Sequence, residues 1–129
     1  YNTALNRKMM DTNALESGID NYTSAKDLGV IMKKWYMNTL ISEEYDNEML
    51  SILSHNTDHS KLPYHLPYGA TVFNKTGTYS TYGVENDVAI IANENGAFVV
   101  SVMTQDGSAV EQIDAMKSLG LNLYENILN

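Results

Sequence analysis

The sequence predicts an α+β domain in which an irregular loop and two helices precede a three-stranded antiparallel sheet and a C-terminal helix. Three observations support this fold class. Apolar residues recur at helical spacing between residues 24 and 55, short apolar runs rich in β-branched residues lie between 70 and 104, and a second helical pattern ends the chain. The 129 residues form one domain, 1–129, and are too few for two.

The first half of the chain predicts a loop followed by two helices. Residues 1–22 are polar and irregular, so we expect an ordered loop after a short helical start. A helix is predicted over residues 24–39 with Ser24 as its N-cap, and a second helix begins after Ser42 and ends near His55. The residues of the second helix that we expect to be buried are Tyr45, Met49, Ile52 and Leu53.

The second half predicts the sheet. Residues 56–69 contain both prolines and are predicted to form an extended connector. Strands are expected from residue 70 through the polar run that follows, at 87–92 and at 97–104. The dipeptide Asn95-Gly96 tolerates the positive φ angles of a tight turn, so the last two strands are expected to pair as an antiparallel hairpin.

The C-terminal segment predicts one further helix. Ser108 and Glu111 have the spacing of a capping box at its start. The residues expected to form its apolar face are Ile113, Met116, Gly120, Leu123 and Ile127.

Composition excludes several functional classes. Sixteen acidic residues against eight basic ones give a net charge of -8, and Arg7 is the single arginine, so no nucleic-acid partner is expected. The absence of cysteine removes disulfides, thiolate metal sites and cysteine nucleophiles. His55 and His59 are four residues apart, but polar residues between them indicate that the helix has ended, so we expect surface histidines, no metal site and no cofactor. No apolar run approaches the length of a membrane span, and no leader sequence is visible.

The tripeptide Lys75-Thr76-Gly77 carries the most chemical information. On a strand it places a cation, a hydroxyl and a gap for a ligand backbone along one edge, which suits binding of a carboxylated acyl substrate. Three fixed residues occur by chance in a chain of this length at a level on the order of a few per cent, so the surroundings must decide. A solvated strand lysine is the alternative for Lys75. The polar residues Asn74 to Thr78 interrupt an apolar strand, however, and such interruptions are typical of functional sites.

Tyrosines surround this tripeptide. They are Tyr64, Tyr68, Tyr79 and Tyr82. They could line a cleft, and packing beneath loops explains them equally well.

The order of these features resembles the C-terminal part of the class A β-lactamases and penicillin-recognising serine hydrolases, a family whose third motif is Lys-Thr-Gly. The segments that resemble the family are, in order, an Ω-loop start, its exit into a helix, the lead-in to the active-site strand, the third motif, two strands and the closing helix. They occupy residues 5–7, 21–25, 62–69, 75–78, 87–91, 98–102 and 108–128. The resemblance covers nearly the entire chain.

The resemblance implies roles for individual residues. Lys75 would hold the substrate carboxylate and tune proton transfer, and Thr76 would donate a hydrogen bond to that carboxylate. Thr78 would lend its backbone N–H to an oxyanion hole. The further substrate-binding candidates are Gly77, Tyr79 and Asn13, and the loop-bracing candidates are Arg7 and Asp20 (or Asn21).

The sequence departs from the family pattern at three points. It contains no Ser-x-x-Lys, so the nucleophile would lie upstream, and Ser54-His55-Asn56 follows the Ω-like loop too late to be the second motif. Met9 occupies the position of the deacylating glutamate, for which Asp11 could substitute only in a loop of different structure. The strand at 87–92 also lacks the arginine that many β-lactamases use to bind a carboxylate.

The resemblance therefore implies the latter half of an extracytoplasmic serine hydrolase that acts on β-lactams or peptide-like amides and is inactive as this chain alone. The 97–104 strand would have an unpaired edge, and we expect that edge to meet either the missing N-terminal half or a second copy of the chain. A non-enzymatic cell-surface binding module of the same fold is the alternative function. An unrelated α+β domain is a third possibility.

Overall fold

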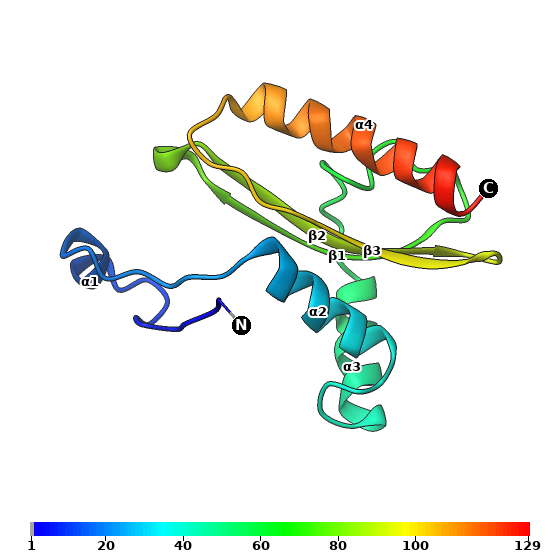
Figure 1. Cartoon of the computed structure of the whole chain (residues 1–129), viewed down its shortest axis with the longest axis horizontal. Helices are drawn as coiled ribbons and strands as arrows, with labels where there is room; N and C mark the ends of the chain where they lie inside the picture. Colours follow the sequence, from blue (N-terminus) through cyan, green and yellow to red (C-terminus); the bar gives the residue numbers. More distant parts are fainter. Residues whose placement is uncertain (1) are drawn as a thin grey trace.

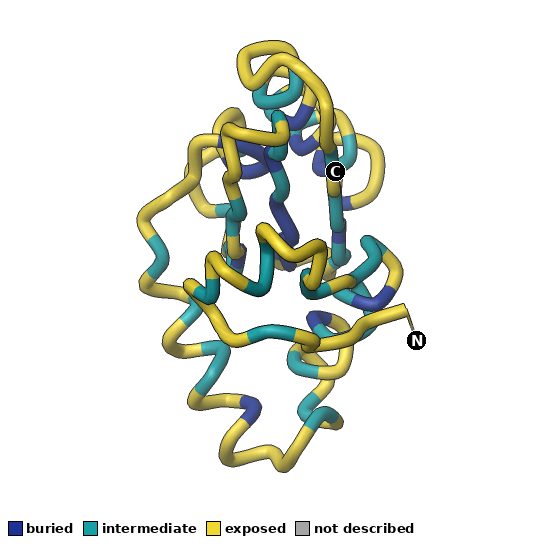
Figure 2. The backbone as a smooth tube through the Cα atoms, turned by 90° about the vertical axis from the view of Figure 1, so that its left-hand side faces the viewer, coloured by how far each residue is buried: buried dark blue, intermediate teal, exposed yellow. Residues whose placement is uncertain are grey.

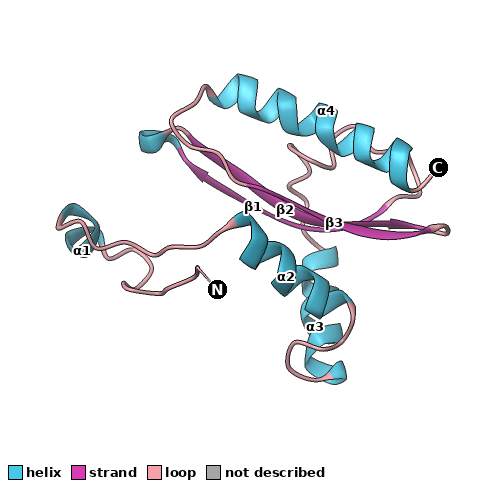
Figure 3. Cartoon of the chain, viewed as in Figure 1, coloured by secondary structure: helices cyan, strands magenta, loops and turns pink. Residues whose placement is uncertain are grey.

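The computed structural model describes residues 2–129 and has the predicted α+β architecture. In Figure 1 the sheet lies between α4 on one face and α2 and α3 on the other. The elements in chain order are α1 (Thr12–Glu16), α2 (Ala25–Tyr36), α3 (Glu43–Ser54), β1 (Thr71–Tyr79), the 3₁₀ turn η1 (Ser80–Tyr82), β2 (Val84–Asn93), β3 (Gly96–Val102) and α4 (Ala109–Ile127). Figure 3 shows the long connector, without regular structure, that leads from α3 into β1.

The sheet is antiparallel and has the order β1-β2-β3. Lys75 of β1 lies opposite Val88 of β2, and Gly77 lies opposite Asn86. Within the described residues, β1 and β3 each pair with β2 alone, so each has one free edge.

Alternation along β2 divides the core into two layers. Ala89 and Ile91 face α4, whereas Val88 and Ile90 face α2 and contact Met32. Figure 2 shows that the buried backbone is concentrated in the sheet and in the helices that cover it, while the outer turns of α3 are largely exposed. The buried residues on the α4 side also include Leu62, Val100, Met116, Tyr124 and Leu128.

Of the two N-caps predicted, at Ser24 and Ser108, the first is confirmed, and Ser42 also caps its helix. The Ser24 hydroxyl accepts the N–H of Asp27 at 3.1 Å, and the Ser42 hydroxyl accepts the N–H of Tyr45 at 3.4 Å. Ser108 precedes α4 as predicted, but its hydroxyl makes no capping bond, so the predicted capping box is wrong. The start of α4 is instead held by the Ser108 carbonyl, which accepts the N–H of Gln112 at 2.9 Å.

The predicted buried face of α3 is partly wrong. Tyr45 and Ile52 are 56% and 67% exposed, whereas Leu50 and Leu53 pack against the layer around Ile90. The helix approaches the sheet through this narrow face alone, and its outer apolar residues contact no other part of the described chain closely enough to be buried.

The β2–β3 hairpin forms as predicted, with a different turn. Asn93 pairs with Gly96, so the two central residues are Glu94 and Asn95, and neither has a positive φ. Gly96 has φ 152° and follows the turn instead of lying at its centre.

The N-terminal loop is closed at its base. Ala4 and Tyr22 form an isolated antiparallel bridge with N–H···O distances of 2.9 and 3.0 Å. The helical segment expected at the start of this loop lies at α1 instead, because the Asp11 carboxylate accepts the N–H of Ala14 at 3.0 Å and so starts a helix there.

Close packing at Gly120 joins α4 to the connector before β1. A Cβ at this position would lie 1.9 Å from the carbonyl oxygen of Leu62. Further along the chain, Tyr124 and Leu128 are buried and Ile127 is 52% exposed, so the predicted apolar face is correct at its centre and wrong at its end.

None of the helices in residues 2–129 is long and apolar enough to cross a membrane.

We predict that Gly120→Ala lowers the free energy of unfolding by about 2–4 kcal/mol, because the new methyl group displaces the backbone of Leu62. Denaturant titration followed by circular dichroism measures the change. Gly29→Ala in α2 is the matched control, since its Cβ would make only an ordinary contact with Ser101 at 3.9 Å and alanine favours the helix by up to about 1 kcal/mol. Equal stability of the two variants would contradict this packing.

Candidate active site

Lys75 and Thr76 point to opposite faces of β1. Lys75 is exposed and shares its face with Phe73, which packs in the layer beneath α2 and α3. Thr76 lies opposite Asp87, on the face that α4 covers. The predicted cation and hydroxyl are therefore adjacent along the strand and lie on its opposite faces.

Asn56 and Lys75 each bind a backbone carbonyl of β1. The amide of Asn56 donates to the carbonyl of Asn74 at 2.9 Å, and the ammonium of Lys75 donates to the carbonyl of Thr76 at 2.6 Å. Backbone groups two residues apart on a strand point the same way, so the backbone of Thr78 points in the same direction as the backbones of Asn74 and Thr76. Within the described residues, no other strand pairs with this edge of β1.

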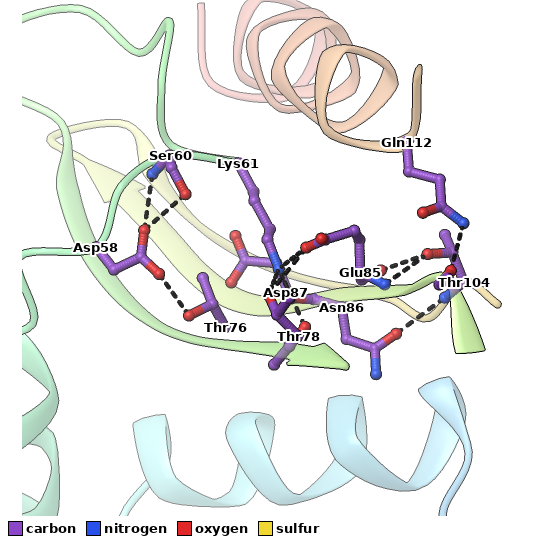
Figure 4. Close-up of polar contacts among 12 residues, drawn as sticks. Asp58, Ser60, Lys61, Thr76, Thr78, Glu85, Asn86, Asp87, Thr104 and Gln112 are labelled. Carbon is purple, nitrogen blue, oxygen red and sulfur yellow. Dashed lines mark hydrogen bonds and ion pairs between the residues drawn. The ribbon is translucent and has the colours of Figure 1, made fainter. Parts of the chain in front are cut away.

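A buried ion pair lies beneath the Lys75-Thr76-Gly77 segment. The Lys61 ammonium is 2.8 Å from the Glu85 carboxylate, and the two side chains are 3% and 7% exposed. Figure 4 shows Lys61 reaching from the connector toward β1 and β2. Its further acceptors are the carbonyls of Gly77 (3.0 Å) and Asn86 (2.9 Å) and the hydroxyl of Thr78 (3.2 Å). An ammonium has three protons, so four acceptors leave Lys61 none for a ligand.

The Glu85 carboxylate is held in its ionised form by this environment. The hydrogen bond from Lys61 is the largest cause that lowers its pKa, burial opposes it, and the Thr78 hydroxyl adds a bond at 2.9 Å. The backbone of Glu85 is fixed as well, because Thr104 accepts its N–H and donates to its carbonyl.

A second buried carboxylate, Asp87, anchors the connector and β1. Its two oxygens accept the backbone N–H of Leu62 and the side-chain amide of Asn74, both at 3.1 Å. Burial raises the pKa of Asp87 against the lowering effect of these bonds. Asn74 is fully buried and also donates to the carbonyl of Asp58 at 3.0 Å, so the residue before Lys75 has a fixed position.

Asp58 binds the Thr76 hydroxyl. The hydroxyl donates to one Asp58 oxygen at 2.6 Å, while the other oxygen accepts the hydroxyl of Ser60 at 2.6 Å and its N–H at 3.2 Å. Figure 4 shows these bonds beside β1. The hydroxyl of Ser60, followed by that of Thr76, lowers the pKa of Asp58 to about 2. The carboxylate is therefore ionised at neutral pH.

The loop candidates lie elsewhere. Arg7 pairs with Asp20 at 2.8 Å, and the pKa of Asp20 is lowered by the N–H of Asn21 and then by Arg7. Asn13 is exposed on α1, which Figure 1 shows apart from the sheet. In the described part of the chain no hydrogen bond joins this loop to β1, so the structure does not bring Asn13 to Lys75.

The other residues that the sequence singled out are Tyr79, Gly77, His55 and His59. Tyr79 is 46% exposed and meets Tyr82 edge to face, with 5.3 Å between ring centroids. A Cβ at Gly77 would make ordinary contact with Asn86 at 3.8 Å, so the fold itself does not require glycine there. His55 and His59 are exposed, and residues 2–129 contain no cluster of three side chains suited to a metal ion.

Sequence analysis missed Lys61, Glu85, Asp87 and Asp58, which make most contacts of this site. The sequence contained one signal for the two carboxylates of β2. Glu85, Asp87 and Ala89 occupy every second position of one strand, so all three face the core, where a carboxylate needs a buried partner. The partners Lys61, Leu62, Asn74 and Thr76 are 13 to 25 residues away in the chain, beyond the reach of any local pattern.

The solved structures to which the chain is similar share its fold. A β-lactamase from Sphaerobacter thermophilus DSM 20745 is 23% identical with a TM-score of 0.76, and the match covers 85% of this chain and 43% of that one. A mutant of PBP-A, solved as an acyl-enzyme complex with penicillin G, is 23% identical with a TM-score of 0.76 and coverages of 97% and 46%. A class A β-lactamase representative from Bacteroides cellulosilyticus DSM 14838 is 20% identical with a TM-score of 0.73 and coverages of 98% and 49%.

These matches define an α+β chain with the fold of the C-terminal part of a β-lactamase. The model of the Beta-lactamase enzyme family matches residues 1–127, and the chain belongs to that family. It spans about half the length of the solved structures. A search of curated proteins found no match.

We predict that Lys61→Met lowers the free energy of unfolding by about 3–5 kcal/mol at pH 7, because it leaves the Glu85 carboxylate buried without its cation. Adding Glu85→Gln restores much of the loss. Glu85 has a lowered pKa, so its stabilising contribution is present above its ordinary value of 4.5 and is lost as the pH falls through the lowered value. The difference between wild type and Lys61→Met therefore narrows below pH 4.5.

Denaturant titrations between pH 3 and pH 7, a range chosen to bracket the ordinary carboxyl pKa values of about 4, measure both effects. Lys117→Met is the control, since Lys117 pairs with a 64% exposed Asp114 and its loss changes stability by no more than about 0.5 kcal/mol. A Lys61→Met variant as stable as this control would show that the buried pair is not formed.

Proposed function

We propose that this chain is the C-terminal half of a β-lactamase-like serine hydrolase that forms an acyl-enzyme with β-lactams or related amides. The observation that carries the proposal is the free edge of β1, where Lys75, Thr76 and Gly77 stand side by side with the backbone of Thr78 next along the strand. Membership of the family and the shared fold supply the setting for this edge.

Three residues of the edge have a proposed task. Lys75, exposed on its face, attracts the substrate and favours proton transfer at the nucleophile. The N–H of Thr78 stabilises the negative charge that develops on the acyl oxygen, and the absence of a side chain at Gly77 lets the acyl group approach. Arg7 and Asp20 brace the N-terminal loop, in which we place the Ω-loop of the family. Asn13 and Tyr79 complete the substrate site once that loop faces β1.

The nucleophile belongs to an upstream half in this proposal. The chain contains no Ser-x-x-Lys and spans about half the length of its structural neighbours. Residues 1–129 are then one portion of a larger domain and are inactive alone. The substrates are β-lactams or peptide-like amides, and the proposed location is extracytoplasmic, as the resemblance implies.

Exposed apolar surface supports an upstream partner. A groove of about 470 Å³ runs between α2 and β3, lined by Tyr36 and Met37 on one side and by Phe98 and Val99 on the other. Tyr36 and Met37 are 44% and 58% exposed, and β3 has a free edge beside them. Apolar surface next to an unpaired strand is typical of a face that another chain segment covers.

A non-enzymatic binding module remains the second candidate, and the N-terminal loop favours it. Met9, at the position of the deacylating glutamate, is 84% exposed, and the Asp11 carboxylate is already used to cap α1. Met9 has no group that can take a proton from water, and one oxygen of the Asp11 carboxylate is engaged in the cap. A protein that kept the fold and lost turnover would have these features.

We predict that a fluorescent penicillin labels the full-length protein covalently and that Lys75→Ala slows labelling by about 100-fold or more. Gel fluorescence after timed incubation measures the rate. Lys117→Ala on α4 is the control and leaves labelling unchanged, because Lys117 contacts Tyr64 and Asp114 away from β1. A full-length protein that is never labelled would refute the hydrolase and leave the binding module.

We also predict that the 129-residue chain produced alone self-associates. Its unpaired β3 edge and the adjoining apolar groove have no cover in isolation. Sedimentation velocity over a hundredfold concentration range, chosen to span about 1–100 μM, measures the assembly. Adding the upstream half in trans should restore a single defined species. A well-folded monomer at every concentration would refute the proposed use of this edge.

A further inference from the structure

A polar pocket lies at the end of the sheet away from Gly77. It has a volume of about 270 Å³, and its lining includes Tyr68, residues 93–95 of the β2–β3 turn and Tyr124 of α4. Figure 1 shows this turn beside the C-terminal end of α4. Gly77 lies opposite Asn86, seven positions before the end of β2, which corresponds to a separation on the order of 20 Å. The pocket is therefore distinct from the β1 edge discussed above.

Hydrogen bonds hold the polar groups of this pocket in place. The side-chain amide of Asn93 donates to the Tyr124 hydroxyl at 3.0 Å and to the carbonyl of Leu128 at 3.1 Å. Its oxygen accepts the N–H of Asn95 at 2.8 Å, and the Asn95 amide donates to the same Leu128 carbonyl at 2.7 Å. The turn is thereby fastened to the end of α4, so a ligand would meet groups that are already ordered.

The same groups keep donors and acceptors for a ligand. The Tyr124 hydroxyl accepts from Asn93, and within residues 2–129 no hydrogen bond uses its own proton. Asn95 keeps its side-chain oxygen and a second amide proton, and the exposed Glu94 adds a carboxylate. Glu94 is the one charged side chain among the described residues of the lining. A mixed set of donors and acceptors without a cation suits neutral hydroxyl groups, each of which both donates and accepts.

Tyr68 adds an apolar face beside these polar groups. Its relative exposure is 108%, so no residue in the described part of the chain covers the side chain. Tyr68 also lines a second hollow, of about 450 Å³, which runs along the connector to the start of β1 and includes Pro63 and Leu66. The tyrosine therefore stands between a polar pocket and a more apolar groove.

We propose that the pocket and the Tyr68 ring form a binding site for a neutral saccharide. A sugar ring has a face of C–H groups, which packs on tyrosine, and a rim of hydroxyl groups that match the donors and acceptors of Glu94, Asn95 and Tyr124. The next sugar unit enters the adjoining groove, because Tyr68 borders both hollows. The Glu94 carboxylate and the net charge of -8 disfavour an anionic ligand. The site is independent of the acyl-enzyme chemistry proposed above.

Two neutral trisaccharides test the proposal. Cellotriose and triacetylchitotriose are titrated at neutral pH into the ¹⁵N-labelled protein at its full encoded length. We expect at least one of them to shift the backbone amide signals of residues 68–69 and 93–95 saturably, with a Kd of about 1 mM, and to leave residues 75–78 unchanged. No shift at about twenty times that concentration, or shifts at residues 75–78 instead, would overturn the proposal.

Variants of the two connector tyrosines identify the stacking surface. Tyr68→Ala should weaken binding by about tenfold or more, whereas Tyr68→Phe keeps the ring and should stay within about twofold of wild type. The exposed position of Tyr68 means that neither change should alter the unfolding midpoint. Tyr64→Ala is the control, because Tyr64 contacts Lys117 and His65 and should leave binding unchanged. Undiminished binding by Tyr68→Ala would refute the role of this ring.

A Glu94→Gln variant separates a saccharide from a cationic ligand, for which spermidine is the probe. The new amide still forms hydrogen bonds, so saccharide binding should stay within about threefold of wild type. A pocket that binds spermidine, loses it with Glu94→Gln and binds neither sugar would be a cation site, contrary to the proposal. Penicillin labelling should be the same in all these variants, and saccharide binding should persist in a protein that penicillin never labels, so the two hypotheses fail separately.

Discussion

The ion pair between Lys61 and Glu85 is the contact on which the geometry of the β1 edge depends. Lys61 belongs to the connector, and its ammonium binds the carbonyls of Gly77 and Asn86 on two neighbouring strands. The connector, β1 and β2 are thereby held at one point. A buried pair of this kind adds little net stability over an apolar substitute, but a wrong arrangement would leave a charge unpaired in the core. A shifted register of β1 would take the carbonyl of Gly77 away from Lys61.

The alternation of side chains along β1 then places residues 74–78 on two faces with different roles. Asn74, Thr76 and Thr78 face the polar network beneath α4, and each is bound there to a side chain of fixed position. Lys75 points to the opposite face and is left exposed. The strand thus presents an exposed cation from a backbone whose flanking side chains are held in place, which is the support that precise ligand placement requires.

Local chemistry explains which parts of the fold could be predicted from the sequence. The Ser24 and Ser42 caps depend on atoms three residues apart, and the β2–β3 hairpin depends on two short runs and the turn between them, so both were visible in the chain. The exposure of Ile52 was not visible, because helical spacing shows that a residue is apolar without showing whether another element covers it. Lys75 and Thr76 were found through their motif. Their supports were not, since Lys61 and Asp58 act across 16 to 25 residues.

The bond between Asp58 and Thr76 has the same electrostatic consequence as other departures from the family pattern. A site built for a free carboxylate needs donors and positive charge, yet the chain has a net charge of -8, no arginine on β2 and an ionised carboxylate bound to the hydroxyl of Thr76. These three features act in the same direction, because each raises the free energy of a bound anion. The exposed Met9 removes the group that would activate a deacylating water. Together they leave Lys75 as the exposed cation of β1 on which anion binding at this edge would depend.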